Sequence, residues 1–392
     1  MSSLIPKLRF SNFQSKWEKL PINSLGKVIT GNTPPTSNSS FYGGSELFVS
    51  PADMGYERYI LKTRTNLTEK GFSKGRVIKA RSALFVCIGS TIGKVAIAGK
   101  DCVTNQQINA IEFSDDFVPE FVYPILEKYA LKIKRFAGEQ AVPIINKSEF
   151  SKFKLPVSTC IEEQQKIADF LTAVDSKISL LTEKHRLLKA YKKGVMQQLF
   201  SQQIRFKDDD GKVFPEWKVE RIGKYLELYR ELVSANTEIP ILTSSRTGLY
   251  PQERAVINEG DYGVVPLGYF TYRHMSDDLV FKFNVNRLWD KGAVSKEYPV
   301  FKTVGMDSYF LELQLNEGND FKRFAIQQKQ GGTRTRLYFK NLKELKLNLP
   351  SLKEQQKIAQ CLQALDNKIN AVAEQIEQTK LFKKGLLQQM FV

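Results

Sequence analysis

The sequence predicts an α/β (α+β) protein built as a pseudo-twofold internal repeat: two globular mixed α/β domains separated by two long antiparallel coiled-coil helices. Three observations predict this fold. A stretch of the chain is duplicated, each copy has the apolar period of a coiled coil, and the remaining segments are rich in short strand-like runs. With 392 residues the chain is long enough for two domains and the elements that connect them.

The duplication is the strongest feature of the sequence. The segment IEEQQKIADFLTAVDSKISLLTEKHRLLKAYKKGVMQQLF begins at Ile161, and LKEQQKIAQCLQALDNKINAVAEQIEQTKLFKKGLLQQMF begins at Leu352. The two align without a gap, and about half of the aligned positions are identical, which chance does not produce over such a length. We interpret them as two copies of one structural element.

Each copy is predicted to form one long helix. Neither contains proline, and glycine occurs only near the end, at Gly194 and Gly385. Apolar residues recur with a 4-3 spacing, which is typical of a narrow coiled-coil seam, so we expect the two helices to pack on each other. The predicted helix-pairing residues are Ile167, Leu171, Val174, Ile178, Leu181, Ile358, Leu362, Leu365, Ile369 and Val372.

Beyond these positions the seam is predicted to shift in the same way in both copies. The next apolar residues are Tyr191 and Val195 in the first copy, and Phe382 and Leu386 in the second. About 40 residues at a rise of 1.5 Å make a rod of about 60 Å, longer than one turn of B-DNA at about 34 Å.

The segments before the helices are related only at their openings. Each opening has an Arg-Phe pair, then Trp17 or Trp217, then a Leu/Ile-Gly-Lys triplet, after which the halves diverge. Runs such as SALFVCIGS and YGVVPLGYFTY, separated by glycine, asparagine and proline, indicate strand-rich domains. The expected boundaries are 1–157 for the first globular domain, 158–200 for the first helix, 201–350 for the second globular domain and 351–392 for the second helix.

The charge balance favours a polyanionic partner. The chain has 58 Lys and Arg against 42 Asp and Glu, a net charge of +16. Cations of this kind bind phosphates and release condensed counterions, although a lysine-rich surface can also serve solubility alone. The chain has only two histidines, His185 and His274, which are too few for a histidine-rich metal site and make a catalytic histidine relay less expected.

The cysteines and the hydropathy pattern indicate a soluble cytoplasmic protein. The four cysteines are scattered without a C-x-x-C pair, which argues against disulfide staples and zinc ribbons. No apolar signal core opens the sequence, and no stretch of about 18 apolar residues could span a membrane.

In the first domain, polar loops are the candidates for DNA contact. The GSTIGK stretch lacks the spacing of a phosphate-binding P-loop, so it is either a tight turn or a backbone contact. Side-chain amides can pair bidentately with adenine, but the same residues could form an ordinary polar turn. The candidate DNA-binding residues here are Thr33, Ser90, Lys94, Asn105, Gln106 and Gln107.

In the second domain, arginines and aromatic residues are the candidates. Arginine is the commonest reader of guanine, and aromatic rings can stack on bases, although a solvated loop and a hydrophobic core are the plain alternatives. The candidate DNA-binding residues here are Tyr269, Tyr272, Arg273, Thr333, Arg334 and Arg336.

The whole layout resembles the specificity subunit of type I restriction–modification systems. The resemblance lies in the E-Q-Q-K-I-A opening of each helix, at Glu163 and Glu354, and in the K-K-G-x-x-Q-Q-x-F ending, at Lys192 and Lys383. GSTIGKVA followed by TNQ resembles the core of a target-recognition domain, and GGTR before KNLKELKLNLP resembles its exit. The second domain departs from the first because it has no G-S-T-x-G-K stretch, so contact residues do not transfer between them.

The resemblance implies a non-catalytic subunit that reads double-stranded DNA. Each domain would read half of a split, asymmetric target, and the helices would set the unread gap. The chain would recruit two methyltransferase subunits and, through the complex, restriction and translocase subunits. It would bind no cofactor itself, because S-adenosylmethionine, ATP and Mg²⁺ would be bound by those partners.

Two other functions stay open at this point. A single-chain DNA-modifying enzyme would need a cofactor glycine loop or a carboxylate cluster, and binding of S-adenosylmethionine by the isolated chain would indicate one. A structural coiled-coil adaptor would associate with partners in a salt-insensitive way and would not bind DNA.

Overall fold

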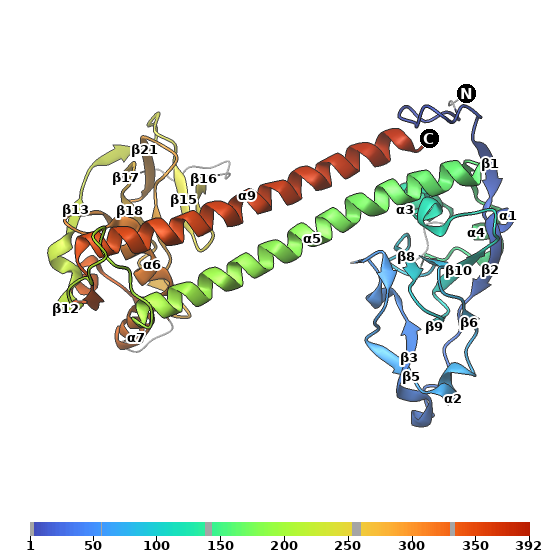
Figure 1. The fold of residues 1–392 in the computed structure, drawn as a ribbon, viewed down its shortest axis with the longest axis horizontal. Helices are drawn as coiled ribbons and strands as arrows, with labels where there is room; N and C mark the ends of the chain where they lie inside the picture. Colours follow the sequence, from blue (N-terminus) through green and yellow to red (C-terminus); the bar gives the residue numbers. More distant parts are fainter. Residues whose placement is uncertain (1–3, 56, 138–142, 253–259, 330–333) are drawn as a thin grey trace. The chain divides into compact units, whose positions relative to one another are not determined.

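The computed structural model describes residues 4–55, 57–137, 143–252, 260–329 and 334–392 (Figure 1). The chain divides into two compact units, one made of Met1–Glu183 with Ala373–Val392 and the other of Lys184–Val372. Each unit contains one globular domain, which we call the first or the second head, together with parts of two long helices. Each head precedes one copy of the duplicated helical sequence. The boundary between the two units, in contrast, falls within both long helices.

The two duplicated segments form the long helices. Helix α5 runs over Ile161–Phe200 and helix α9 over Leu352–Met390. The helices were expected within 158–200 and 351–392. The uninterrupted helical conformation follows from the absence of proline and from the many strong helix formers between the ends.

In the first unit, the start of α5 packs against the end of α9. Ile167 and Leu171 of α5 lie in the same hydrophobic core as Leu386 and Met390 of α9. Asp175 of α5 also forms an ion pair of 2.7 Å with Lys383 of α9. The two segments therefore run antiparallel in this unit.

The second unit repeats the arrangement with the roles of the helices exchanged. Met196 and Leu199 at the end of α5 share a core with Ile358 and Leu362 at the start of α9. Lys192 of α5 pairs with Asp366 of α9 at 2.6 Å. The residues expected to pair the helices are buried or half-buried throughout; they are Ile167, Leu171, Val174, Ile178, Leu181, Ile358, Leu362, Leu365, Ile369 and Val372.

The predicted shift of the seam to Tyr191 and Phe382 was wrong. Their side chains are 61% and 54% exposed. The neighbouring lysines, Lys192 and Lys383, lie on the inner side of the helices instead, because each reaches an aspartate of the facing helix. A charged pair thus occupies the position that the apolar pattern assigned to an aromatic ring.

The first head is built around a sheet with apolar cores on both faces. Alternate residues of β7 belong to different cores, Ala83 and Phe85 to one and Leu84 and Val86 to the other, as the two-residue repeat of a strand requires. Helix α3 (Pro119–Lys134) lies against β8 on one face (Figure 1). The strand order is β2 (Gly26–Thr30), β10 (Ile108–Phe113), β7 (Ala83–Val86), β8 (Val95–Ala98) and β4 (Tyr59–Ile60).

A second sheet covers the opposite face of the first. Leu47 and Val49 of β3 and Cys102 of β9 join the core on that side. The strand order of this second sheet is β5 (Thr65–Leu67), β3 (Tyr42–Val49), β9 (Cys102–Thr104) and β6 (Val77–Ile78). Short helices complete the head: α1 (Ile22–Leu25), α2 (Glu69–Phe72) and α4 (Lys147–Lys152).

The second head has a different set of sheets. One has the order β13 (Leu226–Tyr229), β22 (Val300–Thr303), β18 (Phe270–Tyr272) and β20 (Phe283–Val285), and another the order β14 (Leu232–Ser234), β17 (Asp261–Pro266) and β21 (Lys291–Ser295). Two strand pairs are β15 (Leu242–Ser245) with β16 (Gly248–Pro251), and β19 (Met275–Ser276) with β23 (Thr335–Arg336). The helices are α6 (Ser308–Glu317), α7 (Asn319–Gln327) and α8 (Phe339–Leu342).

The related openings of the two heads form the same frame. In the first head β1 (Glu18–Pro21) pairs antiparallel with β11 (Lys154–Val157), so the entry and the exit of the head meet. In the second head β12 (Lys218–Arg221) pairs in the same way with β24 (Lys346–Leu349). The chain therefore enters and leaves each head beside the start of a long helix.

A buried glutamate joins each head to the helix that follows it. Glu163 of α5 is fully buried and accepts hydrogen bonds from Arg9 at 2.8 Å and from the Trp17 indole at 3.2 Å. We call these three residues the first junction. Because the carboxylate is paired and hydrogen-bonded, its charge is tolerated inside the protein.

The second junction has the same composition. Glu354 of α9 is fully buried and accepts from Arg205 at 3.0 Å and from the Trp217 indole at 3.2 Å. The duplicated arginine, tryptophan and glutamate of the sequence thus form the same contact in both units.

The glutamine after each glutamate holds a helix of the head. Gln164 accepts from the backbone N–H of Val118, the N-cap residue of α3, at 2.9 Å. Gln355 accepts from the backbone N–H of Asp307, the N-cap residue of α6, at 3.1 Å. The repeated Glu-Gln therefore fixes both the entry strand and a helix of each head.

We predict that Glu163→Gln weakens the first unit, because it leaves the guanidinium of Arg9, 10% exposed, without its counter-charge. The expected loss of local unfolding free energy is about 3 kcal/mol, the lower end of what breaking a buried ion pair removes. Hydrogen exchange of the amides in 161–175 measures this loss.

The matched control is Glu162→Gln, since Glu162 precedes Glu163 in the helix and is exposed. An equal effect of the two substitutions would contradict a special role for Glu163.

Candidate nucleic-acid interface

Three loops meet at one edge of the first head and bring most of its predicted residues together. Strand β10 runs antiparallel to β2 and β7, so its start lies beside the ends of both neighbours. The loops that leave β2 and β7 and the turn that enters β10 therefore emerge at the same edge. They carry Thr33, Ser90, Asn105, Gln106 and Gln107.

The polar side chains of these loops are held by one another. The Thr33 hydroxyl donates to the Gln106 side-chain carbonyl at 2.7 Å, and this contact is exposed. Asn105 donates to the Gln107 amide oxygen at 2.9 Å, and Gln107 donates to the carbonyl of Ile88 at 3.3 Å. An ordered row of amides with both donors and acceptors is the chemistry that reads base edges.

An arginine that the sequence analysis missed joins this edge. Arg76 donates from its guanidinium to the carbonyl of Thr30 at 2.8 Å, and its backbone N–H donates to Asn32. It is exposed and lies beside the loop that carries Thr33. Its isolated position in the sequence gave no signal, because the contact joins residues more than 40 positions apart.

Lys94, a predicted DNA contact, is half-buried and supports a loop of the head. Its ammonium donates to the carbonyls of Pro51 and Met54, both at 2.9 Å, and so closes the loop between them. The glycine-rich stretch before it is a tight turn between β7 and β8, with Gly89 and Gly93 at φ of 93° and 99°, where glycine is favoured. Lys94 therefore has a structural role in this fold, and its contact with DNA stays a prediction.

The three predicted arginines of the second head lie on or close to two paired strands. Strand β19 pairs with β23 so that Met275 faces Arg336, and the N–H of Leu337 donates to the carbonyl of His274. Arg273 precedes β19, and Arg334 precedes β23. Each of the three arginines is exposed.

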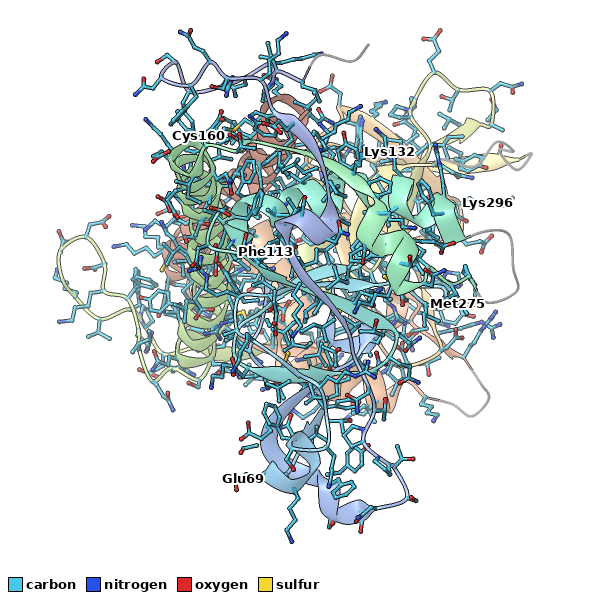
Figure 2. The ribbon with its side chains drawn as sticks, turned by 90° about the vertical axis from the view of Figure 1, so that its right-hand side faces the viewer. Glu69, Phe113, Lys132, Cys160, Met275 and Lys296 are labelled. Atoms are coloured by element: carbon cyan, nitrogen blue, oxygen red, sulfur yellow. The ribbon has the colours of Figure 1, made fainter. Side chains whose placement is uncertain are left out.

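Strand β19 and Arg273 before it line a groove of about 1060 Å³ in the second head. Met275 and Lys296, labelled in Figure 2, are two of its lining residues. Among the described lining residues, the charged ones are Arg246, Arg273, Lys282, Lys296, Asp261, Asp277 and Glu297. Cations and carboxylates are thus interspersed along one concave surface.

The two predicted aromatic residues of the second head, Tyr269 and Tyr272, differ in burial. Tyr272 is fully buried, its hydroxyl donates to the carbonyl of Leu337 at 3.1 Å, and its ring packs on Phe283. Its expected base contact is therefore corrected: alternation along β18 turns the ring into the core. Tyr269 is half-buried against Tyr229, with ring centroids 5.1 Å apart. Thr333, also expected to contact DNA, lies outside the described residues.

His274 is enclosed between aromatic rings beside the groove. Its ring lies 6.1 Å from that of Tyr338 and 6.4 Å from that of Tyr298. Burial lowers the pKa of the imidazole, so the neutral form is favoured near the arginines.

Two further properties bear on the class of site. Among the described residues, no group of three or more His, Cys, Asp and Glu side chains is arranged to hold a metal ion. The described helices include none with the length and hydrophobicity that crossing a membrane would require.

Comparison with known proteins identifies the family. The model of the type I restriction modification DNA specificity domain matches residues 14–190 and 298–380, more than half of the chain. The chain is 26% identical over 246 residues to the MjaIX specificity subunit of Methanocaldococcus jannaschii, covering 58% of this chain and 57% of that subunit. It is 35% identical over 146 residues to the HindI specificity subunit of Haemophilus influenzae, covering 36% of this chain and 31% of the relative.

Coverage of the whole chain comes from a third relative and from a solved structure. The MjaVIII specificity subunit of M. jannaschii is 21% identical over 415 residues, covering 95% of this chain and 91% of that subunit. The crystal structure of a type I restriction–modification S subunit from M. genitalium matches the fold with a TM-score of 0.64 at 15% identity, covering 99% of both chains. The duplicated helices, the strand-rich heads and these matches agree, and the chain belongs to the family of type I restriction–modification specificity subunits.

Proposed function

We propose that this chain is the DNA-reading subunit of a type I restriction–modification complex, with each head reading one half of a split target. The observation that carries the proposal is the combination of two unlike heads with identical frames. The frames repeat the same Arg–Trp–Glu junction, while the exposed edge of the first head carries a row of amides with one arginine and the second head carries three arginines. Unlike surfaces on a common frame suit an asymmetric target.

The reaction chemistry is proposed to belong to partner subunits. The relatives are named specificity subunits, which describes selection of DNA and not its modification. S-adenosylmethionine would be bound by methyltransferase subunits, and ATP and Mg²⁺ by restriction subunits. A net charge of +16 suits binding to the phosphate backbone of the DNA on which all of these subunits would act.

We predict that exchanging the first head for that of another family member replaces one half of the target and leaves the other half unchanged. Mapping of methylated adenines in cells that carry the chain with its methyltransferase partner measures both halves. The unaltered chain provides the baseline site. A change in both halves would show that the heads do not read independently.

The long helices are proposed to set the gap between the half-sites. The test inserts two helical turns at matched positions of α5 and α9. The insertion adds seven residues, or about 10 Å, to each helix. The expected result is a gap longer by about three base pairs, with each half-sequence retained, in the same methylation map. A longer chain with an unaltered gap would rule out the helices as the spacer.

Methyltransferase subunits are proposed to dock on the exposed face near the C-terminal end of each long helix. Gly194 and Gly385 occur at the same position of both copies, and in the described part of the chain nothing outside the helix lies within 4 Å of a Cβ placed there. A helix-interior glycine costs about 1 kcal/mol relative to alanine, so its recurrence needs another reason. Close approach of a partner chain supplies one, and a surface present twice fits two copies of the same partner.

The residues around each glycine support the same proposal. Tyr191 and Phe382 are largely exposed, although aromatic rings are usually buried. Lys193 and Lys384 are identical exposed residues beside them, as are Gln197 and Gln388. Aromatic side chains next to polar ones are typical of protein interfaces.

We predict that Gly194→Leu removes one of two bound methyltransferase subunits, because the side chain blocks close approach at one copy of the surface. Native mass spectrometry of the complex measures the stoichiometry, and Gly194→Leu with Gly385→Leu should remove both subunits. Ser179→Leu, at another exposed position of α5, is the matched control. Unchanged stoichiometry in the double variant would exclude this surface.

A further inference from the structure

Two arginines of the second head are each bound by an aspartate of the same loop. Arg246, at the turn between β15 and β16, pairs with Asp278 at 2.6 Å. Arg334, next to β23, pairs with Asp277 at 2.9 Å. Arg246 and Asp277 line the groove. The adjacent carboxylates of Asp277 and Asp278 thus each pair with an arginine from a different element beside the groove.

The loop that carries the aspartates has a fixed local shape. The Asp278 carboxylate also accepts from the Ser276 hydroxyl at 2.9 Å and from the Val280 N–H at 3.3 Å. Leu279 between them has a φ of 65°, a conformation that is unfavourable for a residue with a side chain. Such a turn holds the carboxylate in one place while Arg246 approaches it.

The bound arginines stay accessible. The side chains of Arg246 and Arg334 are 59% and 58% exposed, so the aspartates do not cover them. A guanidinium has five N–H donors, and a carboxylate uses only part of them. The remaining donors are held in a planar fork, which is the arrangement that pairs bidentately with the O6 and N7 atoms of guanine.

Ion pairs at this exposure contribute little to stability, so stability does not account for the arrangement. A comparable surface pair elsewhere in the head, Arg323 with Asp320 at 2.7 Å, lies within α7 and not on the groove. Unlike Arg323 with Asp320, each of the two pairs joins an arginine and an aspartate from different elements, and one member of each pair, Arg246 or Asp277, lines the groove.

We propose that Asp277 and Asp278 are positioning residues for base recognition: they fix Arg334 and Arg246 so that the second head reads guanine in its half-site. The inference rests on the proposed function, because it assigns a base to one of the two heads. Without the carboxylates, the arginines would rotate freely and would contact any phosphate equally well.

The test uses the full chain in complex with its methyltransferase partner. Methylation rates are compared for the mapped target and for targets with one base pair changed at each position. Asp278→Asn and Asp277→Asn are each expected to reduce discrimination at one guanine of the second head's half-site by about tenfold, as loss of one bidentate pair would. Discrimination in the other half-site should stay unchanged.

Controls separate positioning from folding. Asp320→Asn removes a similar carboxylate from a surface pair of the same head and should leave discrimination intact. Arg246→Ala should affect the same guanine position as Asp278→Asn. Melting temperatures of all the variants should match that of the unaltered chain, since a structural role would lower the melting temperature without selecting one base pair.

Three results would overturn the inference. The second head's half-site could lack guanine, the aspartate variants could change affinity for all DNA without changing discrimination, or they could match Asp320→Asn. If the unaltered chain directs methylation to no split site at all, the proposed function fails as well. The baseline map therefore distinguishes the two failures.

Discussion

The pairing of a buried glutamate with an arginine and a tryptophan is the contact on which the rest of each unit depends. Glu163 and Glu354 are both fully buried, and each accepts from an arginine and an indole of the head that precedes its helix. An isolated charge could not be buried in this way, so the opening of the head, the first turn of the helix and the carboxylate must assemble together. The adjacent glutamine then attaches a helix of the head to the same point.

This constraint explains why the frames are alike while the heads differ. The contacts that attach a head to its helix come from the opening segment, the exit strand and the first turn of the long helix. Residues inside the head can therefore change without disturbing these attachment contacts. The sheets of the two heads have different strand orders, yet β1 with β11 and β12 with β24 close them in the same manner. A fixed attachment with variable contents is what a family of readers with many targets requires.

The helices and the frame could be predicted from the sequence because their signals are local or repeated. The 4-3 apolar spacing identifies buried residues such as Leu171 and Leu362, which the structure places in the cores. The failure at Tyr191 and Phe382 has an electrostatic cause: the aspartate that draws each lysine inward lies on the other helix, more than 170 positions away in the sequence. A hydropathy pattern carries no information about that partner.

The candidate interface was less predictable, since it depends on how strands pair. Thr33 and Gln106 were singled out for their chemistry, but only the pairing of β2 with β10 brings them together. Arg76, which no motif marked, reaches the same edge through its hydrogen bonds to Thr30 and Asn32. Lys94 and Tyr272 have suitable chemistry in the sequence, yet backbone carbonyls and the core occupy their side chains. Side-chain direction, set by tertiary contacts, decides these cases.

The core of the first head contains residues from both extremes of the sequence. Trp17 packs against Phe391 with ring centroids 5.9 Å apart, and Leu386 and Met390 lie in the same cluster. During translation, α9 must therefore leave the ribosome before this core can close. Until then the start of α5 has an uncovered apolar stripe. Nascent chains would thus be exposed to aggregation or chaperone binding for longer than those of a protein with local contacts only.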